Sequence, residues 1–311
     1  MDEIKSEVGY QVRSRYLLYC SLLTSAVALM SSWNLVGRAN SLYAQFLRTV
    51  EESGQQGITL DAALAQPLSV QEQGPGELLI DNVLRYDFET SASAVHNLGP
   101  TAFATNFLQL ATFVAVPAFA FILGCSVLSR DARMAVLKAR VIRVGALRLH
   151  STQAVVTVLV ALGSVLVGLV VAMVSGLAFR QVQLQVDDAR ILDAPAAGIP
   201  LSELAASLGL AALVTAYFAL VGAAFGVALR HVLIPAIAFA VWNTAVPMLG
   251  PWDPRVPWAS LGQRVFDFQG SFQLSVPFSL GTTASAAYLC LLAAIVGLGA
   301  FALARRKSLY A

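Results

Sequence analysis

Six long apolar segments constrain this chain more than any other feature of its sequence. They lie near residues 16–37, 102–128, 153–178, 205–229, 232–250 and 284–304, and none contains Asp, Glu, Lys or Arg. A helix that crosses about 30 Å of hydrocarbon needs roughly 20 predominantly apolar residues. The sequence therefore predicts an all-α integral membrane protein with six transmembrane helices.

The composition agrees with this interpretation. Hydrophobic residues make up 57% of the 311 residues and charged residues only 12%, whereas a soluble domain carries about 25% charged residues. There is too little charge to cover the surface of a soluble protein of this size, so lipid must cover the remainder.

The basic residues are distributed unevenly along the chain. If the N-terminus is cytoplasmic, the inside segments are 1–15, 129–152, 230–231 and 305–311, and they hold most of the Lys and Arg residues and few of the acids. Because Lys and Arg in short loops set the orientation of membrane proteins, we expect a multi-pass plasma-membrane protein with both termini in the cytoplasm.

The segment before the first apolar run has its own pattern. Apolar residues recur there every four positions: Ile4, Val8 and Val12. This spacing predicts an interfacial helix over residues 1–15, with a disordered tail as the alternative. Arg13 and Arg15, followed by Ala26-Val27-Ala28, also resemble a cleaved signal peptide. The run stays apolar through Val36, which favours a retained span.

Three segments are expected on the outside of the membrane. Residues 38–100 form the longest, an extracytoplasmic insertion in which apolar pieces such as Leu78–Ile80 predict a small packed cap. Loops this long are usually functional or disordered. Segment 179–203 is acidic. Segment 251–283 is rich in Pro, Trp and Phe, which predicts a re-entrant or surface-lying piece. We expect residues 1–311 to form a single transmembrane domain.

Motifs for catalysis and cofactor binding are absent from the sequence. There is no phosphate-binding loop and no recognised hydrolase or metalloprotease motif. The histidines are far apart, at His96, His150 and His231, and the cysteines lie in apolar runs, at Cys20, Cys125 and Cys290. We therefore expect that the chain alone is not an enzyme and holds no metal or other cofactor.

The polar residues within the apolar segments are neutral. Those proposed to line a translocation path are Asn34, Asn106, Gln109, Thr215, Tyr217 and Asn243. Ion-coupled carriers and proton pumps usually place ionisable groups at mid-membrane, so energy for transport is expected to enter elsewhere. The alternative for each residue is a polar group satisfied between helices.

The segment 129–152 between the second and third apolar runs is basic and amphipathic. Its charged residues are Arg130, Asp131, Arg133, Lys138, Arg140, Arg143 and Arg148. One interpretation is an anchor that touches anionic lipid. The other is a docking helix for a cytoplasmic partner, and the length of the segment favours docking.

Small residues and prolines indicate how the helices pack. Small residues recur every four positions at Ser164, Gly168, Ala172 and Gly176, and again at Gly222 and Gly226. This spacing predicts close helix contacts, within one chain or between two. Pro117, Pro235 and Pro247 are predicted to kink the second and fifth spans.

In its architecture the chain resembles the permease subunits of the ABC-2 family of ABC transporters. The best local likeness runs from Val116-Pro117 through Ile122-Leu123-Gly124 into Ser129-Arg130-Asp131, and then from Arg143 to Gln153. Asp131 matches an acidic residue that the family often has after its second span. The proline of the family's Pro-x-x-Arg is missing before Arg148, and the long 38–100 insertion departs from compact members.

This resemblance implies the membrane-spanning half of an exporter. It implies a separate cytoplasmic ATP-binding subunit, which would carry the ATP and Mg, and a second permease copy or a related permease. Segment 129–152 would couple to the ATPase, and no nucleic acid is expected as a partner. The alternative function is a non-transport assembly or sensor protein that binds a partner through its 38–100 insertion; an intramembrane enzyme ranks last.

Overall fold

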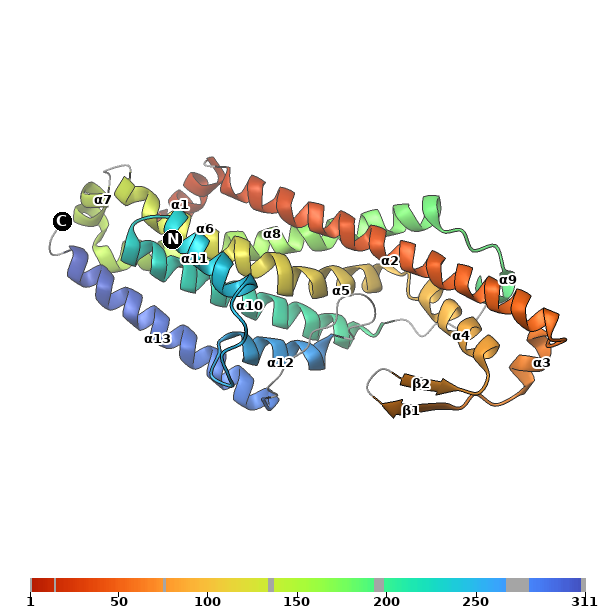
Figure 1. Ribbon diagram of the computed structural model, residues 1–311. Coiled ribbons are helices and arrows are strands. Elements are labelled where there is room, and N and C mark those ends of the chain that lie inside the picture. The colour runs from red at the N-terminus through yellow and green to blue at the C-terminus, as the bar shows by residue number, and fades with distance from the viewer. Residues whose placement is uncertain are drawn as a thin grey trace. The chain divides into compact units, whose positions relative to one another are not determined.

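The computed structural model of the chain describes residues 2–13, 15–74, 77–133, 137–192, 199–266 and 280–308. Helices dominate these residues, and one antiparallel hairpin accompanies them (Figure 1). The long helical stretches are α2 (Tyr16–Gln55), the continuous series α5 (Pro100–Leu110), π-helix η1 (Ala111–Ala115) and α6 (Val116–Arg133), and then α8 (Ala146–Gln183), α10 (Leu201–Leu229) and α13 (Thr282–Ser308). The other elements are α1 (Asp2–Arg13), α3 (Leu60–Ala65), β1 (Val70–Gly74), β2 (Glu77–Ile80), α4 (Val83–His96), α7 (Leu137–Val144), α9 (Ala189–Leu192), α11 (Leu233–Thr244) and α12 (Arg255–Val265).

Five helical stretches among the described residues are long and apolar enough to cross a membrane. They are Tyr16–Gln55, Pro100–Val127, Arg148–Gln183, Leu201–Leu229 and Thr282–Gly299. The prediction of a helical, multi-pass membrane protein is thereby confirmed. The first helix does not end near residue 37 as the sequence predicted but continues to Gln55, into the segment expected to be a loop.

The helix in the predicted span at 232–250 is shorter than the sequence predicted. Only Leu233–Thr244 is helical there, and 12 helical residues rise about 18 Å, short of the roughly 30 Å of hydrocarbon. Pro235 lies in the first turn, where a missing N–H costs nothing, and Pro247 follows the end of the helix. Neither proline kinks a span as predicted, and a count of six spans is not established.

Pro117 has a different consequence. The helix that contains it includes the π-helix η1, and the Val116 N–H donates to the Ala111 carbonyl five residues earlier. The wider turn lies directly before the proline, at the position where a regular helix would lose a hydrogen bond and meet the proline ring. Such π-bulges are frequent at functional sites in helices.

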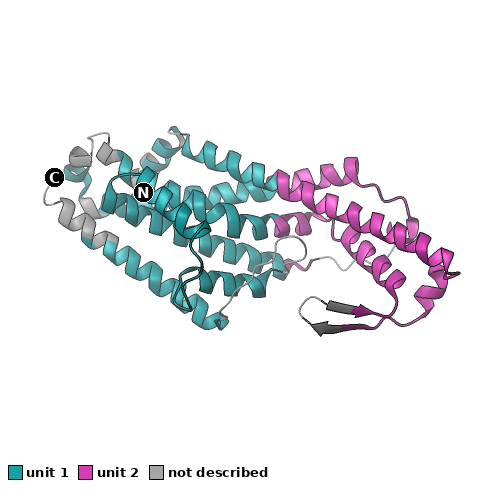
Figure 2. Cartoon of the chain, viewed as in Figure 1, with its two compact units in different colours: residues 1–28, 107–170, 202–311 teal, residues 29–106, 171–201 magenta. Residues whose placement is uncertain are grey.

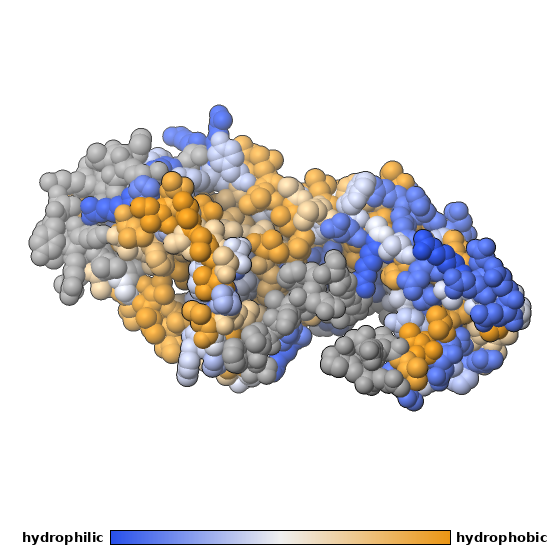
Figure 3. All heavy atoms as spheres, in the orientation of Figure 1, coloured by the Kyte–Doolittle hydropathy of each residue, from blue (hydrophilic) through white to orange (hydrophobic). Residues whose placement is uncertain are grey.

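The chain divides into two compact units (Figure 2). Unit 1 comprises residues 1–28, 107–170 and 202–311, and unit 2 comprises residues 29–106 and 171–201. Helices α2 and α8 each contribute residues to both units. Figure 3 shows apolar residues over much of the visible face of unit 1, whereas hydrophilic residues are frequent on that of unit 2.

Within unit 1, α6 and α10 pack backbone against backbone. A Cβ atom on Gly222 would overlap the Phe121 carbonyl oxygen, and one on Gly226 would lie 2.8 Å from the Cys125 carbonyl oxygen. Gly124 of α6 faces α10 in the same way. The small residues predicted to mark close helix contacts therefore do so, and the contact lies within one chain.

The stripe of small residues on α8 also packs inside the chain. In unit 1, Thr24 donates a 2.7 Å hydrogen bond to the Ser164 carbonyl, and Gly168 leaves space for the ring of Phe107. Because a larger residue at 168 would displace this ring and Thr24, the stripe fixes how closely α2 and α5 approach α8.

The same stripe continues in unit 2. Ser32 donates a 3.2 Å hydrogen bond to the Ala172 carbonyl, and the ring of Phe103 lies over Gly176. Asn40 bonds the end of α8 twice, donating to the Gln183 carbonyl at 2.8 Å and accepting from the N–H of residue 185 at 3.0 Å. Side chain to backbone hydrogen bonds thus hold α2 beside α8 along this length.

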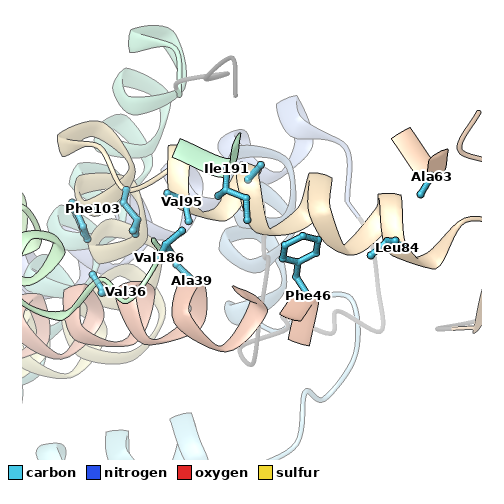
Figure 4. Close-up of a cluster of buried hydrophobic side chains, with 11 residues drawn as sticks. Val36, Ala39, Phe46, Ala63, Leu84, Val95, Phe103, Val186 and Ile191 are labelled. Carbon is cyan, nitrogen blue, oxygen red and sulfur yellow. The ribbon is translucent and has the colours of Figure 1, made fainter. Parts of the chain in front are cut away.

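Unit 2 has an apolar core of its own. Figure 4 shows buried side chains from α2, α3, α4, α5, α9 and the segment after α8 arranged in a row along α2 and α4, with Phe46 near its middle. The cluster comprises Val36, Ala39, Phe46, Ala63, Leu84, Ala92, Val95, Leu98, Phe103, Val186 and Ile191. Asp87 is buried beside it and accepts hydrogen bonds from Thr49 (2.6 Å) and Gln45 (3.2 Å). The 38–100 segment is therefore packed.

Candidate functional site

The basic segment expected at 129–152 folds as an elbow between α6 and α8. We use the term elbow for residues 129–152. Helix α6 ends at Arg133, α7 covers Leu137–Val144, and α8 starts at Ala146. Gly145 joins α7 to α8 with φ +87°, a left-handed conformation that glycine adopts without steric cost. The segment is thus a break between two helices with a short helix inside it.

One side of α7 is held by the N-terminal helix. Arg140 donates a 2.6 Å hydrogen bond to the carboxylate of Glu7, and only 2% of the Glu7 side chain is exposed. A buried carboxylate that lost its cationic partner would be strongly destabilised. Arg140 is therefore committed to a contact within the chain, and the buried face of α1 includes polar residues such as Glu7 and Gln11.

Arg130 makes a second contact with α1. Its guanidinium lies 3.6 Å from the centre of the Tyr10 ring, its Nε donates to the Tyr10 hydroxyl at 2.9 Å, and it also lies 5.6 Å from the Tyr16 ring. Arginine over an aromatic face is favourable, more so when partly desolvated. Two of the seven residues predicted to couple to an ATPase thus fix the elbow to α1.

The outer face of the elbow is exposed. Arg143 and Arg148 have exposed side chains, and 78% of Ile142 is exposed. The side chains of the other three predicted coupling residues, Asp131, Arg133 and Lys138, lie outside the described residues. An exposed large apolar residue between cationic ones is a feature of interaction surfaces.

The six neutral polar residues proposed to line a path belong to both units: Asn34 and Asn106 to unit 2, and the other four to unit 1. Asn106 donates a 3.0 Å hydrogen bond to the Ser31 carbonyl in unit 2, and Thr215 donates a 2.6 Å bond to the Ala211 carbonyl one turn earlier in unit 1. Asn106 is thus satisfied between two helices, as the alternative interpretation expected, whereas Thr215 is satisfied within its own helix. The positions of the others vary: Gln109 and Tyr217 are buried, Asn243 is half-buried and Asn34 is exposed.

The structure contains a buried ion pair that sequence reasoning missed. The guanidinium of Arg255 holds both carboxylate oxygens of Asp253, at 2.7 and 3.0 Å. It also donates to three backbone carbonyls, those of Trp242 (2.9 Å), Val246 (2.6 Å) and Pro247 (2.8 Å). All five N–H groups of the guanidinium are therefore satisfied, and each residue is only 5% exposed. We call this arrangement the Asp253–Arg255 clamp.

The clamp places α12 among the spans of unit 1. Residues Arg255–Gly262 of α12 are all buried. Trp258 stacks on Phe113 with ring centres 5.1 Å apart and meets Phe218 edge to face at 5.6 Å. Phe113 and Phe218 both lie inside candidate spans. The described part of the segment expected outside the membrane thus packs against two candidate spans, and the re-entrant interpretation stays a prediction.

A signal for the clamp was present in the sequence. Asp253 and Arg255 are the first acidic or basic side chains after Arg230, if histidine is set aside, and only Pro254 separates them. When two opposite charges lie so near each other in an apolar stretch, the two side chains are expected to pair with each other inside the protein. The partners of Arg255 were not predictable, because they are carbonyls freed where α11 ends early.

Within the described ranges, no three His, Cys, Asp or Glu residues lie close enough together to hold a metal ion. Comparison with known proteins found no matching family model, no matching curated protein and no matching solved structure. What the structure defines is the class: a multi-pass helical membrane protein with a basic elbow and a buried ion pair. The ABC-2 resemblance stays a prediction.

Proposed function

We propose that the chain is the membrane-spanning subunit of an ATP-driven exporter. The elbow would dock a separate cytoplasmic ATP-binding subunit, which carries the ATP and Mg. A second copy of the chain, or a related permease, would complete the translocation path in the plasma membrane. The termini and the elbow are assigned to the cytoplasm on the basis of their Lys and Arg content.

The exposed face of the elbow carries this proposal. Arg140 and Arg130 are held by α1, so the elbow is anchored to the body of unit 1. Ile142, Arg143 and Arg148 are left exposed. An elbow that is fixed to α1 can transmit the movement of an ATPase subunit to the helices of unit 1, whereas a flexible loop would absorb that movement. Its exposed apolar and cationic side chains could contact such a subunit.

Charge reversal on the exposed face tests the docking. In the variant Arg143→Glu we expect the amount of co-purifying ATPase subunit, labelled with azido-ATP, to fall by tenfold or more, because rim charges steer association and like charges oppose it. The measurement compares the labelled ATPase per permease after purification in mild detergent. Arg140 and Arg130 are left unchanged, because their reversal would break contacts inside the chain.

Arg48→Glu serves as the matched control, since Arg48 is exposed on α2 in unit 2 and should leave the complex intact. Retention of the ATPase by Arg143→Glu at the wild-type level would contradict the docking assignment. Absence of any ATP-labelled partner from the wild-type complex would contradict the proposed function itself.

A second function is supported by a different observation. Unit 2 packs its own apolar core around Phe46, and Ile58 and Val83 expose apolar side chains on it. These features suit the alternative of an assembly or sensor protein that binds an external partner. This alternative would be favoured if an external partner co-purified with the wild-type chain but not with Ile58→Glu/Val83→Glu, and if no ATPase co-purified with either.

A further inference from the structure

Exposed arginines surround one end of the helices of unit 1. Arg13, Arg15, Arg143 and Arg230 all have exposed side chains. The carboxylate of Glu7, also described at this end, is buried and paired with Arg140, so it does not neutralise the exposed arginines. We call these exposed arginines the cationic rim.

Two of these arginines lie level with the end of the spans. The contacts of Gly222 with Phe121 and of Gly226 with Cys125 show that α6 and α10 run in the same direction and in register. One turn beyond Gly226, α10 ends beside Arg230, level with Arg130 of α6. The guanidinium of Arg130 in turn lies 5.6 Å from the ring centre of Tyr16, which follows Arg15. Arg15 and Arg230 therefore occur where the apolar helices begin or end.

The backbone at both positions is unusual. Arg15 has φ 62° and Arg230 has φ 51°, and the other described residues with positive φ are glycines, at 57, 145 and 250. A left-handed conformation is uncommon for a residue with a Cβ atom, and glycine would adopt it with less strain. A strained position that holds arginine instead of glycine indicates that the side chain has a role.

Exposed apolar side chains border both arginines. Leu18 and Tyr19 follow Arg15, and Leu229, Leu233 and Ile234 flank the second arginine; all five are exposed. A guanidinium beside a lipid-facing apolar surface lies at the depth of the phosphate groups of the bilayer, and guanidinium groups bind phosphate through paired hydrogen bonds. We propose that Arg15 and Arg230 bind the phosphate groups of anionic phospholipids. The inference does not depend on the proposed transport function.

The test measures binding of fluorescent phosphatidylglycerol to the detergent-purified full chain, with identically labelled phosphatidylcholine as reference. Replacing both residues in Arg15→Gly/Arg230→Gly removes the charges and relieves the backbone strain, so the fold should be retained or made more stable. Each arginine near an anionic surface contributes roughly a fivefold preference. We expect the phosphatidylglycerol affinity to fall by about twentyfold and the phosphatidylcholine affinity to stay within twofold.

Two further variants keep the result interpretable. Arg15→Lys/Arg230→Lys retains the charge and should keep most of the preference, and Arg48→Gln, on unit 2, should keep all of it. Arg15→Gln/Arg230→Gln is measured in parallel, in case the glycine pair does not purify as a single species. An unchanged phosphatidylglycerol affinity in the glycine and glutamine pairs, or an equal loss for both lipids, would overturn the proposal.

Discussion

Gly222→Ala is expected to destabilise the protein by about 1–3 kcal/mol, the usual cost of overpacking a tight core. The added Cβ would overlap the Phe121 carbonyl oxygen, which belongs to the backbone of α6 and cannot rotate away. The helices α6 and α10 must therefore separate, and the adjacent contact of Gly226 with Cys125 would be lost with them. The measurement is the midpoint of unfolding in detergent titrated with dodecyl sulfate.

Gly209→Ala is the matched control on the same helix. No atom lies within 4 Å of a Cβ placed there, and alanine has the higher helix propensity. We expect this variant to be neutral or more stable by up to about 1 kcal/mol. A loss of stability in Gly222→Ala together with an unchanged or higher stability in Gly209→Ala would show that α6 and α10 are in close contact at Gly222. Equal effects would mean that α6 and α10 do not cross in this way.

Arg255→Met is the second substitution with a large expected effect. It would strand the carboxylate of Asp253, which is 5% exposed, and leave the carbonyls of Trp242, Val246 and Pro247 without a donor. Removing one partner of a buried ion pair typically costs about 3–5 kcal/mol. The same unfolding titration measures the loss, and we expect α12 to be the first segment to gain hydrogen exchange.

Two comparisons separate the clamp from a general loss of charge. Asp253→Asn in the Arg255→Met background removes the stranded charge, so the double variant should be more stable than Arg255→Met alone. Glu89→Gln removes the partner of Arg85 in a partly exposed pair and should cost less than about 1 kcal/mol. A cost for Arg255→Met no larger than that of Glu89→Gln would show that the clamp does not hold α12.

The spans and their close contacts were predictable from the sequence because their causes are local. Runs of residues without charge determine which segments can cross a bilayer. Small residues that recur every four positions, such as Gly222 and Gly226, lie on one face of a helix. Both predictions use residues near one another in the chain. The contacts of the glycines could not be assigned to a helix, because the sequence does not say which helix lies opposite.

The elbow and the clamp were harder to predict because their partners are distant or belong to the backbone. The basic residues of the elbow were recognised, but the attachment of Arg130 and Arg140 to α1 depends on residues more than a hundred positions away. The end of α11 at Thr244 was missed because an apolar run does not reveal where a helix stops. Arg255 donates hydrogen bonds to the carbonyls at and after that end, those of Trp242, Val246 and Pro247.

Docking of an ATPase requires that the elbow face the cytoplasm. Arg143→Cys, made in a Cys290→Ala background that retains the buried Cys20 and Cys125, can be treated with a membrane-impermeant maleimide in intact cells and in inverted vesicles. We expect Arg143→Cys to be labelled in inverted vesicles only, and Arg48→Cys in unit 2 to be labelled in intact cells only. Labelling of Arg143→Cys in intact cells would place the elbow outside, where no ATPase can dock.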